Sequence, residues 1–289
     1  MRDSQPLVAA DVSRRHCLRA ISALTNLGGY TLLLRSLLLL LLCALPCFAQ
    51  RNAEPRPAPL DPVQGEKEAR TLLADMLAQR PDRNTTNTGS VRILDAAGNE
   101  HKIPARFEIY STPTNWASLY EAPFSPGGQP GVKLTVFHNR EQSNSYELLD
   151  RASGGGTNAV PKTLTPAQLM VPFAGSDFWI ADLGLEFLHW PTQRVLRYEM
   201  RHSKSGKVLE SINPAPVPGG YARVVSWIMT ERPHGILHAD AYDAKGELLK
   251  RFDPKNVEKV QGEYQLEEME IRNRQTGSTT FIKFNFNQQ

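Results

Sequence analysis

The chain has 289 residues, of which 40% are hydrophobic and 22% charged, and its formal net charge is +3 at pH 7. Five arginines and two aspartates lie within residues 1–49, which leaves 28 basic and 28 acidic side chains in the remainder. This balance argues against a nucleic-acid-binding surface, because such a surface needs clustered and uncompensated lysine and arginine.

The N-terminal region has the pattern of an export signal. A largely apolar run over residues 36–49 follows Arg35 and ends in the small Ala49 before the polar Gln50. The run is shorter than the ~20 apolar residues that span a bilayer, so it predicts a signal peptide cleaved after Ala49 and a periplasmic protein. All three cysteines precede this cleavage site, so the exported chain has no disulfide and no thiolate ligand.

Two export routes fit this leader. The segment 13–19 contains Arg14-Arg15 and resembles a twin-arginine motif, whereas six consecutive leucines suit the general secretory route. A start of translation downstream of residues 1–34 is a third interpretation. Each of the three predicts export.

After the leader, residues 50–62 contain four prolines among polar residues and predict a flexible tether. Residues 63–289 show no linker that would divide them, so we expect a single domain. A helix opens this domain, because Asp61 can cap it, Pro62 suits its first position and Gln64 stands where a capping box places it. One face of that helix is apolar, with Ala69, Leu72, Leu73, Met76 and Leu77 at helical spacing.

From residue 91 the apolar period changes to two, which predicts half-buried antiparallel strands around residues 103–110, 132–137 and 281–286. Four-residue turns with a capping side chain first and glycine last join such strands at 95–98, 203–206 and 243–246. The sheet is therefore expected to be a meander.

One insertion interrupts the strands. Thr165-Pro166-Ala167-Gln168 predicts a short helix, and residues 178–190 are dense in large apolar side chains, with Asp177 and Asp182 among or beside them. A segment this apolar in the middle of a meander is expected to cover an apolar part of the sheet.

The chain from residue 172 to its end resembles the outer-membrane lipoprotein-sorting proteins, the LolA/LolB-like superfamily, and more closely an uncharacterised periplasmic branch of it. The matching motifs are Gly175-Ser176-Asp177-Phe178, Asp182-Leu183, and residues 221–228 (YARVVSWI), 241–250 (AYDAKGELLK), 268–273 (EMEIRN) and 277–280 (GSTT). The resemblance implies a strongly curved antiparallel sheet, an incomplete β-barrel or half-barrel closed by short helices, and binding of an apolar ligand. The sequence departs from the lipoprotein carrier at Thr112, where the carrier has an arginine that engages the lid helix.

On this basis we expect an exported, non-enzymatic binding protein that acts as a monomer and needs no cofactor. It would hold a lipid, an acyl chain or a lipidated protein in an apolar cavity, with lipoprotein sorting and envelope protein partners as the implied context. The expected cavity and lid residues are large and apolar: Trp116, Tyr120, Phe178, Trp179, Leu183, Trp190, Trp227 and Phe284, with Leu72, Leu73 and Met76 on a lid helix. Each of these side chains, taken singly, is also compatible with an ordinary core.

Two alternatives remain from the sequence. One is an envelope hydrolase acting on lipid or polysaccharide through acids such as Asp177 and Asp182, and the other is a non-catalytic protein-interaction module. His234 and His238 have metal-like spacing, but Pro233 and Gly235 disfavour a helix there, so we expect no metal site. Gly175-Ser176-Asp177 is interpreted as a helix cap.

Overall fold

The structure is a computed structural model that describes residues 58–122, 131–140, 142–151, 159–260 and 263–286, and no side chains for 258–260, 263 and 264. The predicted signal peptide (1–49) and residues 50–57 of the predicted tether lie outside the described residues. The described chain belongs to one compact unit that begins at Pro57. No helix in the described part of the chain combines the length and the apolar character needed to cross a membrane.

The described elements are mostly strands. They are α3 (Pro62–Ala78), β1 (Thr85–Leu94), β2 (Glu100–Ser111), β3 (Trp116–Ala122), β4 (Val132–His138), β5 (Ser145–Asp150), β6 (Lys162–Thr163), η3 (Pro166–Gln168), α4 (Ile180–Leu183), η4 (Glu186–His189), β7 (Thr192–Arg201), β8 (Lys204–Ile212), β9 (Arg223–Met229), β10 (Ile236–Tyr242), β11 (Leu248–Val260), β12 (Glu263–Asn273) and β13 (Thr279–Asn285).

Within the described residues, all strands form one 13-stranded sheet in the order β6-β5-β4-β3-β2-β1-β13-β12-β11-β10-β9-β8-β7. Every pairing in it is antiparallel, and all paired strands are consecutive in sequence except β1 and β13, the first strand and the last. The sheet does not close, because β6 and β7 remain at opposite edges. The predicted fold class, a mainly β open antiparallel sheet with short helices, is confirmed.

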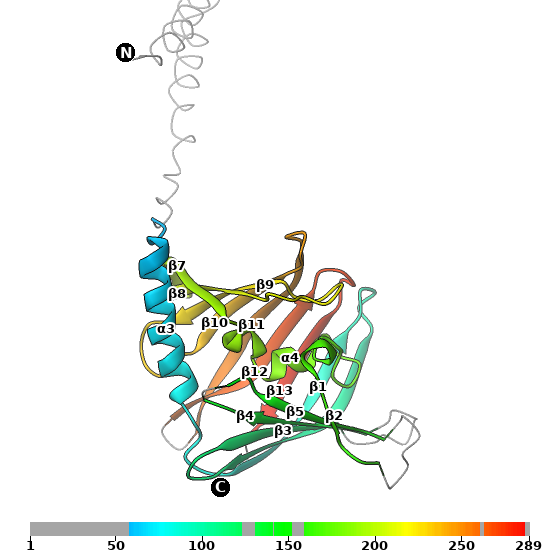
Figure 1. The fold of residues 1–289 in the computed structure, drawn as a ribbon. Coiled ribbons are helices and arrows are strands. Elements are labelled where there is room, and N and C mark those ends of the chain that lie inside the picture. The colour runs from blue at the N-terminus through cyan, green and yellow to red at the C-terminus, as the bar shows by residue number, and fades with distance from the viewer. Residues whose placement is uncertain (1–57, 123–130, 141, 152–158, 261–262, 287–289) are drawn as a thin grey trace, which may run out of the picture. The chain divides into compact units, whose positions relative to one another are not determined.

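This strand order determines the path of the insertion. Strands β6 and β7 are consecutive in sequence but lie at the two edges of the sheet, so residues 164–191, here called the plug, must cross the sheet from edge to edge. Figure 1 shows the strands curving around the short helices of the plug, with α3 (blue) running beside β7. The plug therefore occupies the hollow of the curved sheet.

The first helix follows the sequence prediction closely. The Asp61 carboxylate accepts hydrogen bonds from the backbone N–H groups of Val63 (3.0 Å) and Gln64 (3.2 Å), which satisfies two of the free amides at the helix start. The predicted capping box does not form, because the Gln64 side chain donates to Glu68 instead. Gly65 allows close approach to the sheet, since a Cβ there would lie 2.5 Å from the carbonyl oxygen of Val195 on β7.

Two hydrophobic clusters lie on the face of the sheet that the helices cover. The first joins β1–β5, β12 and β13 to the first part of the plug. The second joins β7–β11 to α3 and the η4 part of the plug. Leu60, just ahead of α3, packs against the second cluster and donates a backbone hydrogen bond to Leu196 (2.8 Å), so the described end of the predicted tether is attached to β7.

The turns differ in one place from the sequence prediction. At 95–98 and 243–246 the first residue, Asp95 or Asp243, accepts two backbone hydrogen bonds and the glycine has positive φ, as expected. At 203–206 the prediction is wrong, because β7 and β8 are joined by the two left-handed residues His202 and Ser203. This two-residue hairpin leaves Gly206 inside β8.

Candidate functional site

The plug fills the hollow that the sequence predicted to be empty. Phe178 and Leu183, expected in a lid, are 1% and 6% exposed and belong to the first hydrophobic cluster. Trp179 and Trp190, also expected in the lid, pack against the second cluster. The predicted lid residues therefore form part of the core beneath the sheet.

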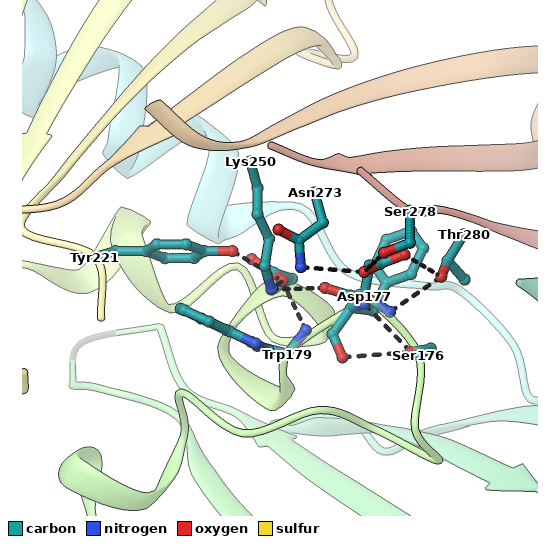
Figure 2. Close-up of polar contacts among 10 residues, drawn as sticks. Ser176, Asp177, Trp179, Tyr221, Lys250, Asn273, Ser278 and Thr280 are labelled. Atoms are coloured by element: carbon teal, nitrogen blue, oxygen red, sulfur yellow. Dashed lines mark hydrogen bonds and ion pairs between the residues drawn. The ribbon is translucent and has the colours of Figure 1, made fainter. Parts of the chain in front are cut away.

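A buried aspartate anchors the middle of the plug to the central strands β12 and β13 (Figure 2). The Asp177 carboxylate accepts hydrogen bonds from three side chains of β12, the following turn and β13: Asn273 Nδ2 (3.1 Å), Ser278 Oγ (2.6 Å) and Thr280 Oγ1 (2.8 Å). The backbone N–H of Asp177 donates to the same Thr280 hydroxyl at 3.0 Å. The sequence predicted that Asp177 caps a helix, and this is wrong, because β12, β13 and the turn between them offer its carboxylate three amide and hydroxyl donors.

A buried lysine forms the second anchor. Lys250 on β11, 1% exposed, donates from Nζ to the carbonyl oxygen of Asp177 at 2.6 Å and lies 3.5 Å from the ring centre of Trp179. Its nearest Asp182 carboxylate oxygen is 3.8 Å away. Burial lowers the pKa of Lys250 to about 8, although the Asp182 and Asp177 charges oppose this change.

Asp182 is the polar centre of the short helix α4. Its Oδ2 atom accepts hydrogen bonds from the Trp179 backbone N–H (2.7 Å) and the Tyr221 hydroxyl (3.2 Å), as Figure 2 indicates around Trp179 and Tyr221. Burial raises the pKa of the Asp182 carboxyl, with Lys250 opposing the change. Asp182, rather than Asp177, therefore satisfies the first free amide of the helix.

The other half of the sheet holds the plug at the turn between α4 and η4. Asn144 Nδ2 donates to the Gly184 carbonyl at 2.8 Å, and Tyr120 Oη donates to the Leu183 carbonyl at 3.1 Å. The Tyr146 hydroxyl donates to the buried Glu186 carboxylate at 2.7 Å. The plug is thus fastened to both halves of the sheet by polar contacts in a largely apolar interior.

An open cleft remains at one end of the plug. It has a volume of about 710 Å³ and is lined by the end of α3 and the residues after it (76–81), the β2–β3 turn (113–116), the β4–β5 turn (138–140 and Asn144), the plug (Gly184, Leu185, Leu188 and His189) and His234. This volume lies within the range of about 300–1,000 Å³ typical of small-molecule sites. The cleft is our candidate functional site.

The floor of the cleft combines an aromatic stack with a buried imidazole. Trp116 and His138, paired on β3 and β4, stack with ring centres 3.5 Å apart and an interplanar angle of 10°. His138 Nε2 lies 2.6 Å from the Ser118 hydroxyl. Burial, with a smaller contribution from the charge of His189, lowers the pKa of His138 to about 3, so this imidazole is neutral at pH 7.

Arg80 closes the cleft on the side of α3. Its Nη1 atom donates to the carbonyl oxygens of Thr112 (3.2 Å) and Pro113, which ties the segment after α3 to the β2–β3 turn. This residue was not anticipated from the sequence, because no periodicity or motif indicates which turn an arginine after a helix will reach. The same holds for His138, whose role depends on its register opposite Trp116.

Of the residues predicted to bind ligand, Trp116 and Met76 line the cleft. The remaining cavity residues of the helix-covered face lie in core: Tyr120 and Phe284 pack against the first cluster, and Phe284 contacts Phe107 with ring centres 4.6 Å apart. Leu72 is buried in the second cluster and Leu73 packs against it.

The expected orientation of Trp227 is wrong. Val224 and Ile228 on β9 belong to the cluster beneath α3, whereas Trp227 packs with Val225 and Val208 on the opposite face of the sheet. There it contacts His238 with ring centres 5.1 Å apart. Trp227 is therefore core of the outer face and does not point toward the helices, because both faces of β9 are apolar and alternation alone could not orient them.

The two histidines with metal-like spacing take separate partners. His238 Nδ1 lies 2.6 Å from Asp253, and its Nε2 lies 3.1 Å from Asp240. His234 Nδ1 lies 2.9 Å from the Met229 carbonyl oxygen. Among the described residues, no group of three or more histidine, cysteine, aspartate or glutamate side chains is arranged to hold a metal ion.

Comparison with solved structures identifies the architecture. A DUF1329 family protein from Desulfovibrio piger matches with a TM-score of 0.60 and 19% identity, over 78% of this chain and 92% of that chain. A domain assigned to outer membrane lipoprotein-sorting proteins, from Vibrio parahaemolyticus, matches with a TM-score of 0.62 and 18% identity, over 78% of this chain and 91% of that chain. The chain has a LolA-like fold.

A LolA superfamily protein from Nitrosomonas europaea gives a further match, with a TM-score of 0.51 and 15% identity over 77% of this chain and 92% of that chain. A family model described as an uncharacterized protein matches residues 159–288. No curated protein matched. At these identities the structural matches establish the fold.

Many residues of the sequence motifs that carry the resemblance hold the plug in the structure. Ser176, Asp177, Asp182, Tyr221, Lys250, Asn273, Ser278 and Thr280 all lie in those motifs and in the buried polar network. The carbonyl oxygen of Thr112, which follows β2, accepts a hydrogen bond from Arg80, which follows α3. The LolA-like features of this chain therefore concern the plug more than the cleft.

Proposed function

We propose that this protein is an exported, non-enzymatic carrier that binds a lipid, an acyl chain or a lipidated partner in the cleft beside Trp116. The observation that carries the proposal is the cleft itself, about 710 Å³ in volume and bordered by Met76, Leu77, Leu185 and Leu188. These aliphatic side chains lie beside polar ones such as Arg80 and Asn144, and this mixture suits a ligand that has an aliphatic chain and a polar group. The LolA-like fold, shared with a domain assigned to lipoprotein sorting, supports the same class of ligand.

The proposal includes cleavage after Ala49 and a periplasmic location. It also assigns Asp177 and Asp182 to holding the plug. The Asp177 carboxylate accepts from three side-chain donors and the Asp182 carboxylate from an amide and a hydroxyl, and neither residue lines the cleft. This geometry supports a structural role for them over the hydrolase alternative.

A direct test compares two aspartate substitutions on α3. Met76 lines the cleft, whereas Val63 on the same helix is 75% exposed and lies outside it. Because a charge is unfavourable against an acyl chain, Met76→Asp should weaken binding of a fluorescent fatty-acid probe at least tenfold, while Val63→Asp should leave it unchanged. Native mass spectrometry of protein purified from the periplasm should reveal a co-purifying lipid.

The filled hollow of the sheet favours a second candidate, a non-catalytic envelope module that docks on a protein. Phe178 and Leu183 occupy the space in which a buried acyl chain would otherwise lie. If the wild-type protein carries no lipid after purification and binds no fatty-acid probe, the carrier proposal fails and the module becomes the better interpretation.

A further inference from the structure

The ionisable side chains that line the described part of the cleft are all basic. Its described lining contains Arg80, Arg140 and the histidines His138, His189 and His234, and it contains no aspartate or glutamate. Several arginines elsewhere on the sheet have carboxylate partners instead, as in Arg106 with Glu121 at 2.9 Å. The cleft therefore presents cationic groups that are not neutralised by its own described walls.

Each arginine of the cleft retains hydrogen-bonding capacity. Arg80 uses Nη1 for two backbone carbonyls, which leaves the other N–H groups of its guanidinium without a partner among the described residues. Arg140, in the β4–β5 turn, is exposed and makes no hydrogen bond or ion pair with the described part of the chain. A guanidinium presents several N–H donors in a plane, which suits a carboxylate or a phosphate.

The acid that precedes this lining on α3 is already engaged. Asp75, which precedes Met76 on α3, lies 2.6 Å from Arg232 and 3.6 Å from His234. Burial lowers the pKa values of His138 and His189, so the arginines supply the positive charge of the cleft at neutral pH. The apolar walls and the two arginines thus occupy one continuous site.

We propose, building on the carrier function above, that the cleft selects amphiphiles with an anionic head group, a carboxylate or a phosphate monoester, over neutral amphiphiles of the same chain length. The aliphatic chain would lie along Met76, Leu185 and Leu188, and the head group would meet Arg80 and Arg140. The contribution of the arginines would be selectivity, because chain burial contributes equally to both classes of ligand.

Isothermal titration with dodecanoate, dodecyl phosphate, dodecanol and inorganic phosphate tests this. Wild-type protein should bind dodecanoate and dodecyl phosphate about tenfold or more tightly than dodecanol, and inorganic phosphate much more weakly than dodecyl phosphate. Arg140→Gln, which removes no contact within the described chain, should reduce the preference for the anions and leave dodecanol binding unchanged. Arg80→Gln should also reduce the preference for the anions, and Arg80→Lys should restore part of it; the dodecanol comparison rests on Arg140→Gln, because Arg80 also holds the β2–β3 turn.

Arg274→Gln is the matched control, because Arg274 is exposed in the β12–β13 turn and lies outside the cleft. Equal affinity of wild-type protein for dodecanoate and dodecanol would overturn the anion selectivity while leaving the carrier function intact. Binding of inorganic phosphate as tight as that of dodecyl phosphate would also overturn it, since the aliphatic chain of the ligand would then contribute nothing to affinity. Absence of binding to every amphiphile would overturn the carrier function as well.

Discussion

The ammonium group of Lys250 on β11 lies 3.5 Å from the centre of the indole ring of Trp179, the residue that precedes helix α4. The same Nζ atom donates to the Asp177 carbonyl oxygen at 2.6 Å. A cation held against an aromatic face is favoured more strongly when water is excluded. The contact therefore fixes the plug at the point where it turns beneath the sheet.

Lys250→Met should destabilise the protein by about 3 kcal/mol, because Asp182 then stays buried without its cation and the Asp177 carbonyl loses its donor. Urea unfolding followed by circular dichroism measures the change. Lys102→Met is the control, since Lys102 is exposed on β2, and it should shift the free energy by less than about 0.5 kcal/mol. Equal unfolding midpoints for the two variants would show that Lys250 does not anchor the plug.

Stability should depend on pH through His138. Its pKa is lowered to about 3 in the folded protein, against about 6.5 in an unfolded chain. At a pH between these two pKa values, the imidazole is protonated in the unfolded state and neutral in the folded state. The free energy of unfolding therefore falls as the pH falls. The slope from this group reaches about 1.4 kcal/mol per pH unit.

The measurement is the denaturation midpoint between pH 6.5 and 5, compared for wild type, His138→Gln and the exposed control His101→Gln. His189, whose pKa is also lowered by burial, acts in the same direction, so the difference between wild type and His138→Gln isolates His138. Parallel pH profiles for all three proteins would contradict the buried, neutral state of this imidazole.

Asp177→Ala should cost about 3 kcal/mol and loosen the plug. The substitution removes the common acceptor of Asn273, Ser278 and Thr280 in a buried position, and buried donors left without a partner are costly. Asp243→Ala is the matched control, because Asp243 accepts two backbone hydrogen bonds in an exposed turn. It should cost about 1 kcal/mol or less.

Limited proteolysis adds a readout of the plug itself. Cleavage within residues 164–191 should become faster in Asp177→Ala and stay at the wild-type rate in Asp243→Ala. If Asp177→Ala is destabilised without faster cleavage of the plug, the carboxylate supports the β12–β13 hairpin alone.

Two tryptophan substitutions should separate stability from binding. Trp227→Ala removes a side chain that is 8% exposed and packed on the outer face, so it should cost about 3–5 kcal/mol and leave fatty-acid probe affinity unchanged. Trp116→Ala should cost less and weaken probe binding, because Trp116 is only partly buried and lines the cleft. A loss of affinity in Trp227→Ala alone would place the ligand on the opposite face of the sheet.

Local sequence features determined the elements of this protein. The helix Pro62–Ala78 was predictable because its cap, its first-turn proline and its apolar stripe all lie within one short segment. The alternation of Ile103, Ala105 and Phe107 likewise identified a half-buried strand, and all three side chains are buried. These signals arise from the backbone periods of helix and strand, which act between residues near in sequence.

The tertiary structure alone decided which face of the sheet is inner and where the cleft lies. Trp227 and Ile228 are both buried and apolar, so their order along β9 shows that they point to opposite faces but not which face meets the helices. The cleft depends on Arg80 reaching the Thr112 and Pro113 carbonyls and on Trp116 stacking on His138 across two strands. Contacts of this kind are set by strand register and by the path of the plug from one sheet edge to the other, because they join residues whose separation along the chain carries no periodic signal.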